Sequence, residues 1–284
     1  MNPEIPNQLR NKFVGLDVYL ARHCNLRCRG CTRYSNIAKP KFYDATQLIS
    51  DLLTMISKGI NLTRITLTGG EPLLHPDFIT IIKDIRSRMN NTVIDLFTNG
   101  KLFMEMKDEL LPALKKYNVE VLFSRYDTDI EYDQMTEVCK QNEIFCKSIS
   151  EVVTGKDSVI RKFTCNRISH PSNKSRHPVW KYNYCSDTCP CLWDSKIFLC
   201  GRCALIDSLN EYMHTSFKQT EKDYIKVSDL ESTEQYLCYI SKPIPFCKYC
   251  FNQPGKNIIW STKKPQLSDF ICVEKEGKLT KWLV

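Results

Sequence analysis

The sequence predicts an α/β protein whose first half alternates strands and helices, followed by a cysteine-rich region at 185–272. Residues 13–20, FVGLDVYL, alternate as a half-buried strand does. Apolar residues between 45 and 56 then recur at helical spacing, with Asp44 as the expected N-cap and Gly59 as the stop. Because this strand–helix order repeats, we expect parallel βα units, arranged as a barrel or an open sheet.

The later elements of the first half follow from the same patterns. Strands are expected at RITLT, TVIDLF, VEVLFS and IFCKSI, with a sixth near 158–165. Helices are expected at 78–89, at 102–117 with a break or restart at Pro112, and at 131–142. Such folds place their chemistry at the C-terminal ends of strands, where the first cysteines, GGEP, TNG and Ser124 all fall.

Composition and charge exclude several classes of protein. No apolar run approaches the roughly 20 residues that span a bilayer, and the first residues lack the apolar core of a signal peptide. We therefore expect a cytoplasmic protein without membrane contact, in which fifteen cysteines serve metal or redox chemistry rather than disulfides. The net charge of +8 is explained by solvated Lys and Arg, and without a basic cluster with interleaved aromatics we expect no nucleic-acid partner.

Three cysteines lie within eight residues directly after the first strand. Cys24, Cys28 and Cys31 have the spacing Cx3Cx2C. Three thiolates can hold three corners of a cubane iron–sulfur cluster, whereas a structural zinc site or a ferredoxin cluster has four protein ligands. The spacing therefore predicts a cluster with one open iron. The alternative is a zinc site completed by His23 or by a distant cysteine.

Two motifs resemble those of the radical S-adenosylmethionine (SAM) superfamily. CNLRCRGC resembles its Cx3Cx2C signature, and TGGEPLLHPDF resembles its second motif. The resemblance covers roughly residues 13–165 and implies a partial (β/α)6, TIM-like barrel. It also implies a [4Fe–4S] cluster whose open iron binds SAM, and an electron donor such as flavodoxin or ferredoxin. The cofactor would then yield a 5′-deoxyadenosyl radical that takes hydrogen from a substrate.

The resemblance also implies contacts to SAM at the strand ends. Glycines let backbone polar groups approach a cofactor closely, and hydroxyl, amide and carboxylate groups can bind its ribose, carboxylate and ammonium groups. Many members carry an aromatic residue just before the third cysteine, where this chain has Gly30. The expected SAM-binding residues are Gly69, Gly70, Glu71, Thr98, Asn99 and Ser124.

The second cysteine field resembles the SPASM and shorter twitch modules that follow some radical SAM barrels. YCSDTCPCLWDSKIFLCGRC reads as a loop and a hairpin that turns at Asp194–Ser195, with Ser195 where those modules have glycine. The resemblance implies a second [4Fe–4S] cluster, and a structural zinc ribbon is the alternative. The expected ligands are Cys185, Cys200, Cys247 and Cys250, with Cys203 competing with Cys200 and with Cys189 or Cys191 competing with Cys185.

These observations predict a domain plan and a reaction class. We expect a barrel at 13–168, a linker at 169–184 and an auxiliary-cluster domain at 185–272. The cysteine spacing is similar to that of 2-deoxy-scyllo-inosamine dehydrogenases, so we expect oxidation or epimerisation of a small polyhydroxylated substrate, a sugar or aminocyclitol. Cys165 and Arg167, near the end of the barrel, are the expected catalytic residues.

Two other functions stay open. One is a peptide maturase, an epimerase or crosslinking enzyme, that works with a separate leader-binding partner, because Cys24 lies too near the first residue for a leader-binding domain to precede it. The other is a non-catalytic iron–sulfur or zinc protein that binds a partner. Cys139 and Cys146 are expected to be small buried apolar residues.

Overall fold

The computed structural model describes residues 14–126, 129–149, 152–155, 158–165, 168–169, 185, 189–250 and 256–272. Residues 170–184 of the predicted linker lie outside these ranges. Among the described residues, no helix is both long enough and apolar enough to cross a membrane.

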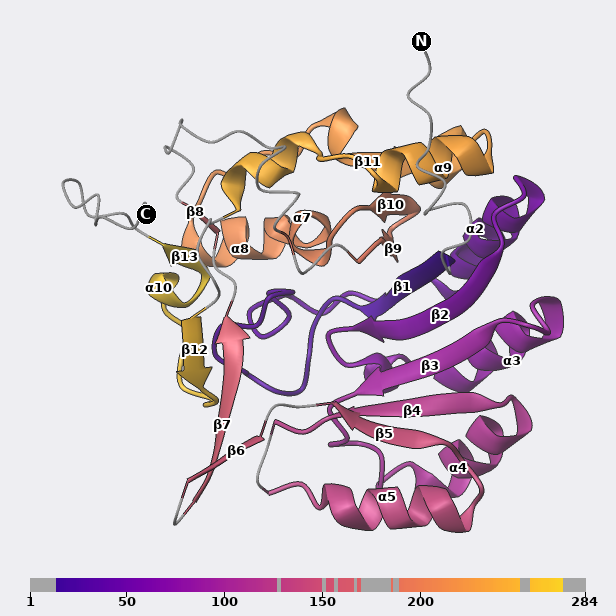
Figure 1. Ribbon diagram of the computed structural model, residues 1–284, viewed down its shortest axis with the longest axis vertical. Coiled ribbons are helices and arrows are strands. Elements are labelled where there is room, and N and C mark those ends of the chain that lie inside the picture. The colour runs from indigo at the N-terminus through magenta and orange to yellow at the C-terminus, as the bar shows by residue number, and fades with distance from the viewer. Residues whose placement is uncertain are drawn as a thin grey trace, which may run out of the picture.

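The main sheet has eight strands in the order β11-β10-β9-β1-β2-β3-β4-β5 (Figure 1). Its first five strands in the chain are parallel and adjacent, as the alternating pattern predicts. They are β1 (Val14–Ala21), β2 (Leu62–Gly69), β3 (Val93–Thr98), β4 (Val119–Ser124) and β5 (Cys146–Ile149). This mostly parallel α/β sheet confirms the predicted fold class.

Four helices pack along these strands: in Figure 1, three of them lie on the right and the fourth lies at the bottom, below β5. Asp44 caps the first of them by accepting a hydrogen bond from the Gln47 N–H at 2.8 Å, as predicted. Pro112 lies inside the third, where its missing N–H leaves only the carbonyl of the exposed Asp108 unpaired, which water can bind. The helices are α2 (Ala45–Ser57), α3 (Phe78–Arg88), α4 (Lys107–Lys116) and α5 (Tyr132–Gln141).

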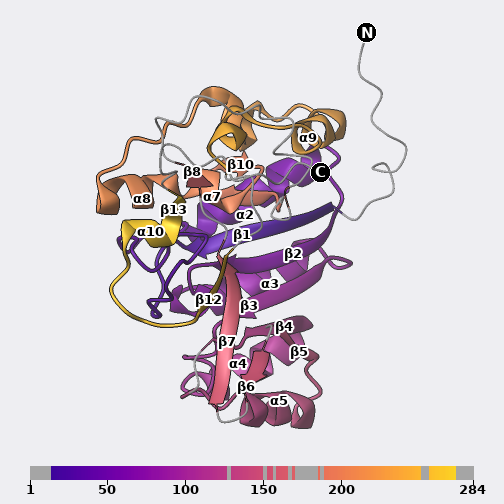
Figure 2. The same ribbon diagram turned by 60° about the vertical axis from the view of Figure 1, so that its left-hand side comes forward.

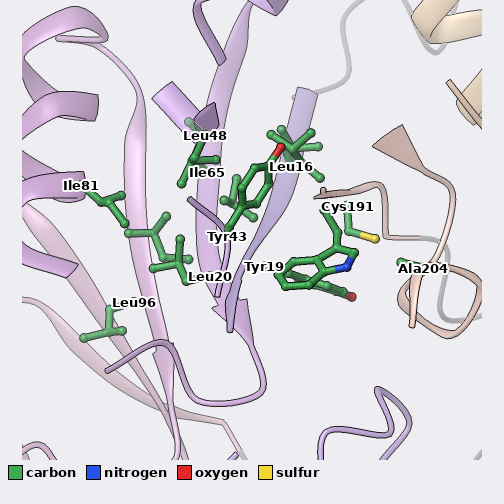
Figure 3. Packing of buried hydrophobic residues seen from close by; sticks show 14 of the residues in the cluster. Leu16, Tyr19, Leu20, Tyr43, Leu48, Ile65, Ile81, Leu96, Cys191 and Ala204 are labelled. Carbon is green, nitrogen blue, oxygen red and sulfur yellow. The ribbon is translucent and has the colours of Figure 1, made fainter. Parts of the chain in front are cut away.

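The two faces of the sheet differ in chemistry. Figure 3 shows Leu20, Ile65, Ile81 and Leu96 to one side of β1, in the core beneath the helices. The opposite face carries polar residues, because alternate residues of a strand point to opposite faces. On β1 these are Asp17 and Tyr19, and the register places them beside Thr66 and Thr68 of β2. We call this polar side the inner face.

The cysteine-rich region extends the same sheet on the far side of β1. The hairpin of β9 (Cys191–Trp193) and β10 (Lys196–Phe198) forms as predicted, and β9 pairs with β1 in parallel. β11 (Tyr224–Lys226) completes the edge. Short helices cover this part: α7 (Gly201–Ala204), α8 (Ile206–Met213), α9 (Thr233–Ile240) and the 3-10 helix η4 (Pro245–Tyr249). The predicted boundary between two domains is thus crossed by a continuous sheet.

A strand forms at 158–165, as predicted, but it does not join the main sheet. β7 (Ser158–Cys165) pairs antiparallel with β6 (Val152–Gly155) and β12 (Lys256–Ile259) in a separate sheet. Figure 1 shows this small sheet near the C-terminal ends of the parallel strands. Beyond it, α10 (Leu267–Phe270) leads into β13 (Ile271–Cys272), which pairs with β8 (Ile168–Ser169).

The hairpin turn is anchored to α2 although it requires an unusual backbone. Asp194 and Ser195 have φ of 53° and 57°, in the left-handed region, as in a type I′ turn. Ser195 Oγ donates to the buried Asp51 carboxylate at 2.8 Å, and the Ser195 N–H donates to the Tyr43 hydroxyl at 2.7 Å. The hydrogen bond from Ser195 Oγ to Asp51 compensates for the left-handed backbone strain at position 195, which a glycine there would avoid.

We expect Ser195→Ala to lower the thermal unfolding midpoint more than Ser195→Gly. Both lose the hydrogen bond to a charged group, about 1.5–3 kcal/mol, but glycine recovers about 1–2 kcal/mol of left-handed strain. Asp194→Gly is the matched control and should be neutral or stabilising, since Asp194 makes only an exposed ion pair with Lys41. Equal midpoints for the two Ser195 variants would contradict this account of the turn.

Candidate active site

The loop between β1 and α2 carries the three predicted cluster cysteines. Cys24, Cys28 and Cys31 are all half-buried, and Cys24 interacts electrostatically with both of the others. The Cys31 N–H donates to the Cys28 carbonyl at 3.3 Å, and Gly30 between them has φ of 67°. At position 30 a glycine meets the left-handed backbone requirement, which an aromatic residue would meet only with strain. The loop therefore turns three thiols toward one another.

Cys24 receives hydrogen bonds on its sulfur. The Leu26 N–H donates to Cys24 Sγ at 3.3 Å and Asn99 Nδ2 donates at 3.4 Å. Burial raises the pKa of the Cys24 thiol well above its usual range, and the neighbouring Glu71 raises it further. Such a site disfavours a bare thiolate but suits one bound to a cation, which removes the penalty of the buried charge.

The two glycines of GGEP make room for the cysteine loop itself. A Cβ on Gly69 would lie 2.4 Å from the Ala21 carbonyl oxygen, and one on Gly70 only 1.9 Å from that of His23. The Gly70 N–H also donates to the Ala21 carbonyl at 2.7 Å. The missing side chain of Gly69 would thus meet the backbone at the end of β1, and that of Gly70 the backbone of the cysteine loop, while the expected approach of these glycines to SAM stays a prediction.

Glu71 ties the ends of two strands together from a fully buried position. Its carboxylate accepts hydrogen bonds from Thr98 Oγ1 at 2.7 Å, the Asn99 N–H at 2.9 Å and the Leu73 N–H at 3.1 Å. Burial raises the pKa of Glu71 to about 7, and these three donors oppose that shift. Of these three hydrogen bonds, Oε2 accepts only the one from Asn99, so this oxygen retains a lone pair for a further donor.

Asn99 and Ser124 lie where the ends of β3 and β4 meet. Asn99 Nδ2 contacts both Cys24 Sγ and, at 2.9 Å, Asn25 Oδ1. The Tyr132 hydroxyl donates to the Asn99 carbonyl at 2.8 Å and the Ser124 carbonyl at 3.1 Å. The structure therefore brings the predicted strand-end residues together around the cysteine loop.

Thr68 supplies an independent sign that this place accommodates a ligand. It is fully buried on the inner face, one residue before GGEP, and its hydroxyl has no hydrogen-bond partner among the described residues. A buried hydroxyl without a partner is costly, and a bound polar molecule would satisfy it. The donor set, three soft sulfurs beside unfilled polar capacity, fits a cluster that binds a polar cofactor.

Sequence reasoning missed three polar residues on the inner face. Arg33, two residues after Cys31, donates from Nε to the Tyr19 hydroxyl at 3.3 Å and from a terminal nitrogen to Asp17 at 3.3 Å. Its guanidinium also lies over the rings of Tyr19 and Phe97. The available signal was Asp17, a carboxylate inside an otherwise apolar strand.

The predicted second group of thiols also converges. Cys200 interacts electrostatically with Cys247 and Cys250, and Cys247 interacts with Cys185. Burial is the main cause that raises the pKa of Cys200, Cys247 and Cys185, and for Cys200 and Cys247 the neighbouring cysteines add to it. Crowded thiols, of which at least these three resist ionisation, are again a donor set suited to a bound cationic centre.

Two of the competing cysteines lie near the same group of thiols, since Cys191 interacts electrostatically with Cys200, and Cys203 with both Cys200 and Cys247. Cys191 and Cys203 are fully buried in the core, and Figure 3 shows Cys191 between Tyr19 and the ribbon that bears Ala204. Cys203 Sγ donates to the Asp223 carbonyl at 4.0 Å, a long sulfur contact. Cys189 forms a hydrogen bond with Asp17 instead of facing Cys247. Which of these cysteines act as ligands therefore stays a prediction.

A short chain of contacts links the two groups of thiols. A Cβ on Gly201, the residue after Cys200, would lie 2.0 Å from the Tyr19 hydroxyl oxygen. Tyr19 in turn accepts the hydrogen bond from Arg33, which follows Cys31 by two residues. Tyr19 and Arg33 thus connect the residue that follows Cys200 to the loop that bears Cys31.

The predicted catalytic pair is not placed at this site by the structure. Arg167 and the side chain of Cys165 lie outside the described residues, so both stay predictions. Of the two cysteines expected to be small buried apolar residues, Cys139 is fully buried, as expected, whereas Cys146 is only half-buried.

Residues 18–137 match the family model described as the Radical SAM superfamily. These residues form a radical SAM domain. Domains of this family use a [4Fe–4S] cluster and SAM, which agrees with the donor set of the cysteine loop. The domain contains all of the strand-end residues described above.

Curated relatives match part of the chain. The GTP 3′,8-cyclase of Rippkaea orientalis is 33% identical over 112 residues, which cover 37% of this chain and 33% of the relative. The probable GTP 3′,8-cyclase of Methanococcus aeolicus is 34% identical over 118 residues, covering 40% and 39%. The alignments span about a third of the length of these relatives.

Solved structures show distant similarity. BtrN in an open conformation aligns with a TM-score of 0.43 and 13% identity, covering 85% of this chain and 93% of that chain. SuiB of Streptococcus suis bound to SAM aligns with a TM-score of 0.32 and 16% identity, covering 54% and 44%.

We expect Gly70→Ala to displace the cysteine loop of the radical SAM domain. The added Cβ collides with the His23 carbonyl, so the variant should lose about 1–3 kcal/mol of stability and much of the iron bound at this loop. Gly15→Ala on β1 is the matched control, because its Cβ would meet nothing within 4 Å. The measurements are thermal unfolding and iron content after anaerobic reconstitution. Equal iron in the two variants would contradict the packing argument.

Proposed function

We propose that the chain is a radical SAM enzyme that removes a carbon-bound hydrogen from a small polyhydroxylated molecule, a sugar or aminocyclitol. The product would be an oxidised or an epimerised substrate. The observation that carries the proposal is that three thiols, rather than four, converge on one loop beside an unpartnered buried hydroxyl. An external one-electron donor, such as flavodoxin or ferredoxin, is part of the proposal.

Named residues take distinct roles in this proposal. Cys24, Cys28 and Cys31 would hold the first cluster, and bound SAM with this cluster would supply the radical that abstracts hydrogen. Asn99 orients Cys24 through its amide, and Glu71 holds Asn99 in place. Thr68 and the free lone pair of Glu71 are the groups that could bind the polar end of SAM.

A second [4Fe–4S] cluster held by Cys185, Cys200, Cys247 and Cys250 is the next part of the proposal. A single zinc ion would require its thiolates to converge to about 2.3 Å from the metal. The crowding of these thiols suits either centre, so a structural zinc ribbon is the alternative and the metal content of the protein decides between them.

The inner face supports a small, polar and largely uncharged substrate. Asp17 pairs with Arg33, and Arg64 pairs with Asp95 at 2.5 Å and with Glu120 at 3.6 Å, so each cation of this face is matched by a carboxylate. Hydroxyl and amino groups of a sugar can hydrogen-bond to such paired groups. A strongly anionic substrate would instead require an excess of cations.

The second cluster supports oxidation in particular. After loss of a hydrogen atom, an alcohol carbon must lose one more electron and a proton to become a ketone. A cluster next to Gly201, in contact with Tyr19, is within reach to accept that electron. In epimerisation a thiol would return a hydrogen atom from the opposite face, and Cys165 remains the proposed donor, with Arg167 beside it in sequence.

GTP is the second substrate that we consider. The reason is that relatives up to 34% identical to part of this chain are named GTP 3′,8-cyclases. A nucleoside triphosphate carries several negative charges, which the paired charges Asp17–Arg33 and Arg64–Asp95 do not favour.

The cluster assignment predicts a specific loss of iron. Anaerobically reconstituted protein should hold about eight iron atoms, and the triple variant Cys24→Ala, Cys28→Ala, Cys31→Ala should hold about four and form no 5′-deoxyadenosine from SAM. Replacing Cys139, which is buried far from these loops in sequence, by Ala should leave both values unchanged. SAM cleavage by the triple variant, or zinc in place of the second four irons, would overturn the assignment.

The substrate class predicts the origin of a hydrogen atom. Deuterium from a ring-labelled sugar or aminocyclitol should appear in 5′-deoxyadenosine, and none should come from ribose-labelled GTP or a labelled peptide. Cys165→Ala separates the two reactions, because an epimerase that relies on it would lose product yet still cleave SAM, whereas a dehydrogenase would be little affected. Label arriving from GTP or a peptide alone would replace our choice of substrate.

A further inference from the structure

The C-terminal segment 256–272 returns to the loop that bears the first three cysteines, although it follows the second cysteine pair in the chain. The Arg29 N–H donates to the Ser261 carbonyl at 2.9 Å, and Arg29 Nε pairs with the buried Asp269 carboxylate at 2.6 Å. The rings of Tyr34 and Phe270 meet edge to face at 5.7 Å. Figure 2 shows α10 beside this loop.

Trp260 makes the most consequential contact of this segment. Its indole Nε1 donates a hydrogen bond to Cys28 Sγ at 3.1 Å. An indole N–H can only donate, so the sulfur must be the acceptor. Trp260 is half-buried, so its large apolar ring is partly packed into the protein while its N–H reaches Cys28. The contact joins a residue of the cysteine-rich region to a proposed cluster ligand of the radical SAM domain.

A hydrogen bond to a ligand sulfur changes the energy of electron uptake by a cluster. One-electron reduction of a [4Fe–4S] cluster from its 2+ to its 1+ state adds negative charge that spreads onto the thiolate sulfurs. An N–H donor stabilises this more negative state, so the reduction potential rises. Removal of the donor, with the ring retained, should therefore lower the potential.

We propose that Trp260 is a positioning residue that raises the reduction potential of the cluster at Cys24, Cys28 and Cys31 through its hydrogen bond to Cys28. The inference rests on the proposed function, because it requires a cluster at these cysteines. Through Trp260, the segment 256–272 would control how readily the cluster of the radical SAM domain accepts an electron. The Arg29–Asp269 ion pair holds that segment, and with it the indole, against the loop.

The test is an anaerobic redox titration of the reconstituted protein, followed by the electron paramagnetic resonance signal of the reduced first cluster. Trp260→Phe keeps an aromatic ring but has no N–H. Ser261→Ala is the matched control, because it leaves the indole and the Ser261 carbonyl in place. Asp269→Asn weakens the ion pair without touching the indole.

We expect Trp260→Phe to lower the ratio of reduced to oxidised cluster about three- to tenfold at a fixed potential, tenfold being about 59 mV for one electron. Asp269→Asn should give a smaller shift of the same sign, and Ser261→Ala none. Equal potentials for Trp260→Phe and the wild type, with both clusters present, would overturn the inference alone. Absence of a cluster from the wild-type loop would instead overturn the proposed function.

A second measurement covers the case in which Trp260→Phe fails to bind iron. Wild-type protein made with tryptophan labelled with ¹⁵N in the indole ring should show a ¹⁵N hyperfine coupling to the reduced first cluster, and Ser261→Ala should retain it. Without such a coupling in the wild type, the indole would not contact the cluster and the inference would be wrong.

Discussion

The parallel pairing of β9 with β1 is the constraint on which the two cysteine regions depend. Asp17 and Val18 of β1 lie opposite Cys191 and Leu192 of β9, and the Asp17 N–H donates to the Pro190 carbonyl at 2.9 Å. Through this short pairing the main sheet continues from β1 into the cysteine-rich region. It places the start of α7 against Tyr19 of β1, which accepts a hydrogen bond from Arg33 of the first cysteine loop.

The loop with the first cysteines is held from three directions. Gly70 at the end of β2 packs against the loop backbone, and Asn99 at the end of β3 donates to Cys24. Trp260 donates to Cys28 from the C-terminal segment. Because the supports come from separate parts of the chain, the positions of the thiols depend on the folding of both regions. Cluster assembly and tertiary structure are thus coupled, as is usual for metal sites.

The sequence predicted those features that depend on residues close together in the chain. The Asp44 cap is set by neighbours in the chain, and the position of the hairpin turn and of the three-cysteine loop by the residues within them, although the bonds of Ser195 to Tyr43 and Asp51 come from far along the chain. The sixth strand was misplaced because pairing partners are not encoded in a strand's own periodicity: β7 meets a strand from the C-terminal segment. The contact of Trp260 with Cys28 spans 232 positions, and no local signal marks it. Arg33 resembles any surface arginine until its partners on β1 are known.

The central claim is that the chain holds two cubane clusters, of which one, held by three cysteines, has an open iron for SAM. Mössbauer spectroscopy of protein reconstituted with ⁵⁷Fe tests this most directly, because it resolves individual iron environments. The account predicts two [4Fe–4S] clusters and, on addition of SAM, a changed signal from about one iron in eight. A spectrum that shows both clusters but does not respond to SAM would contradict the claim, as would a single cluster.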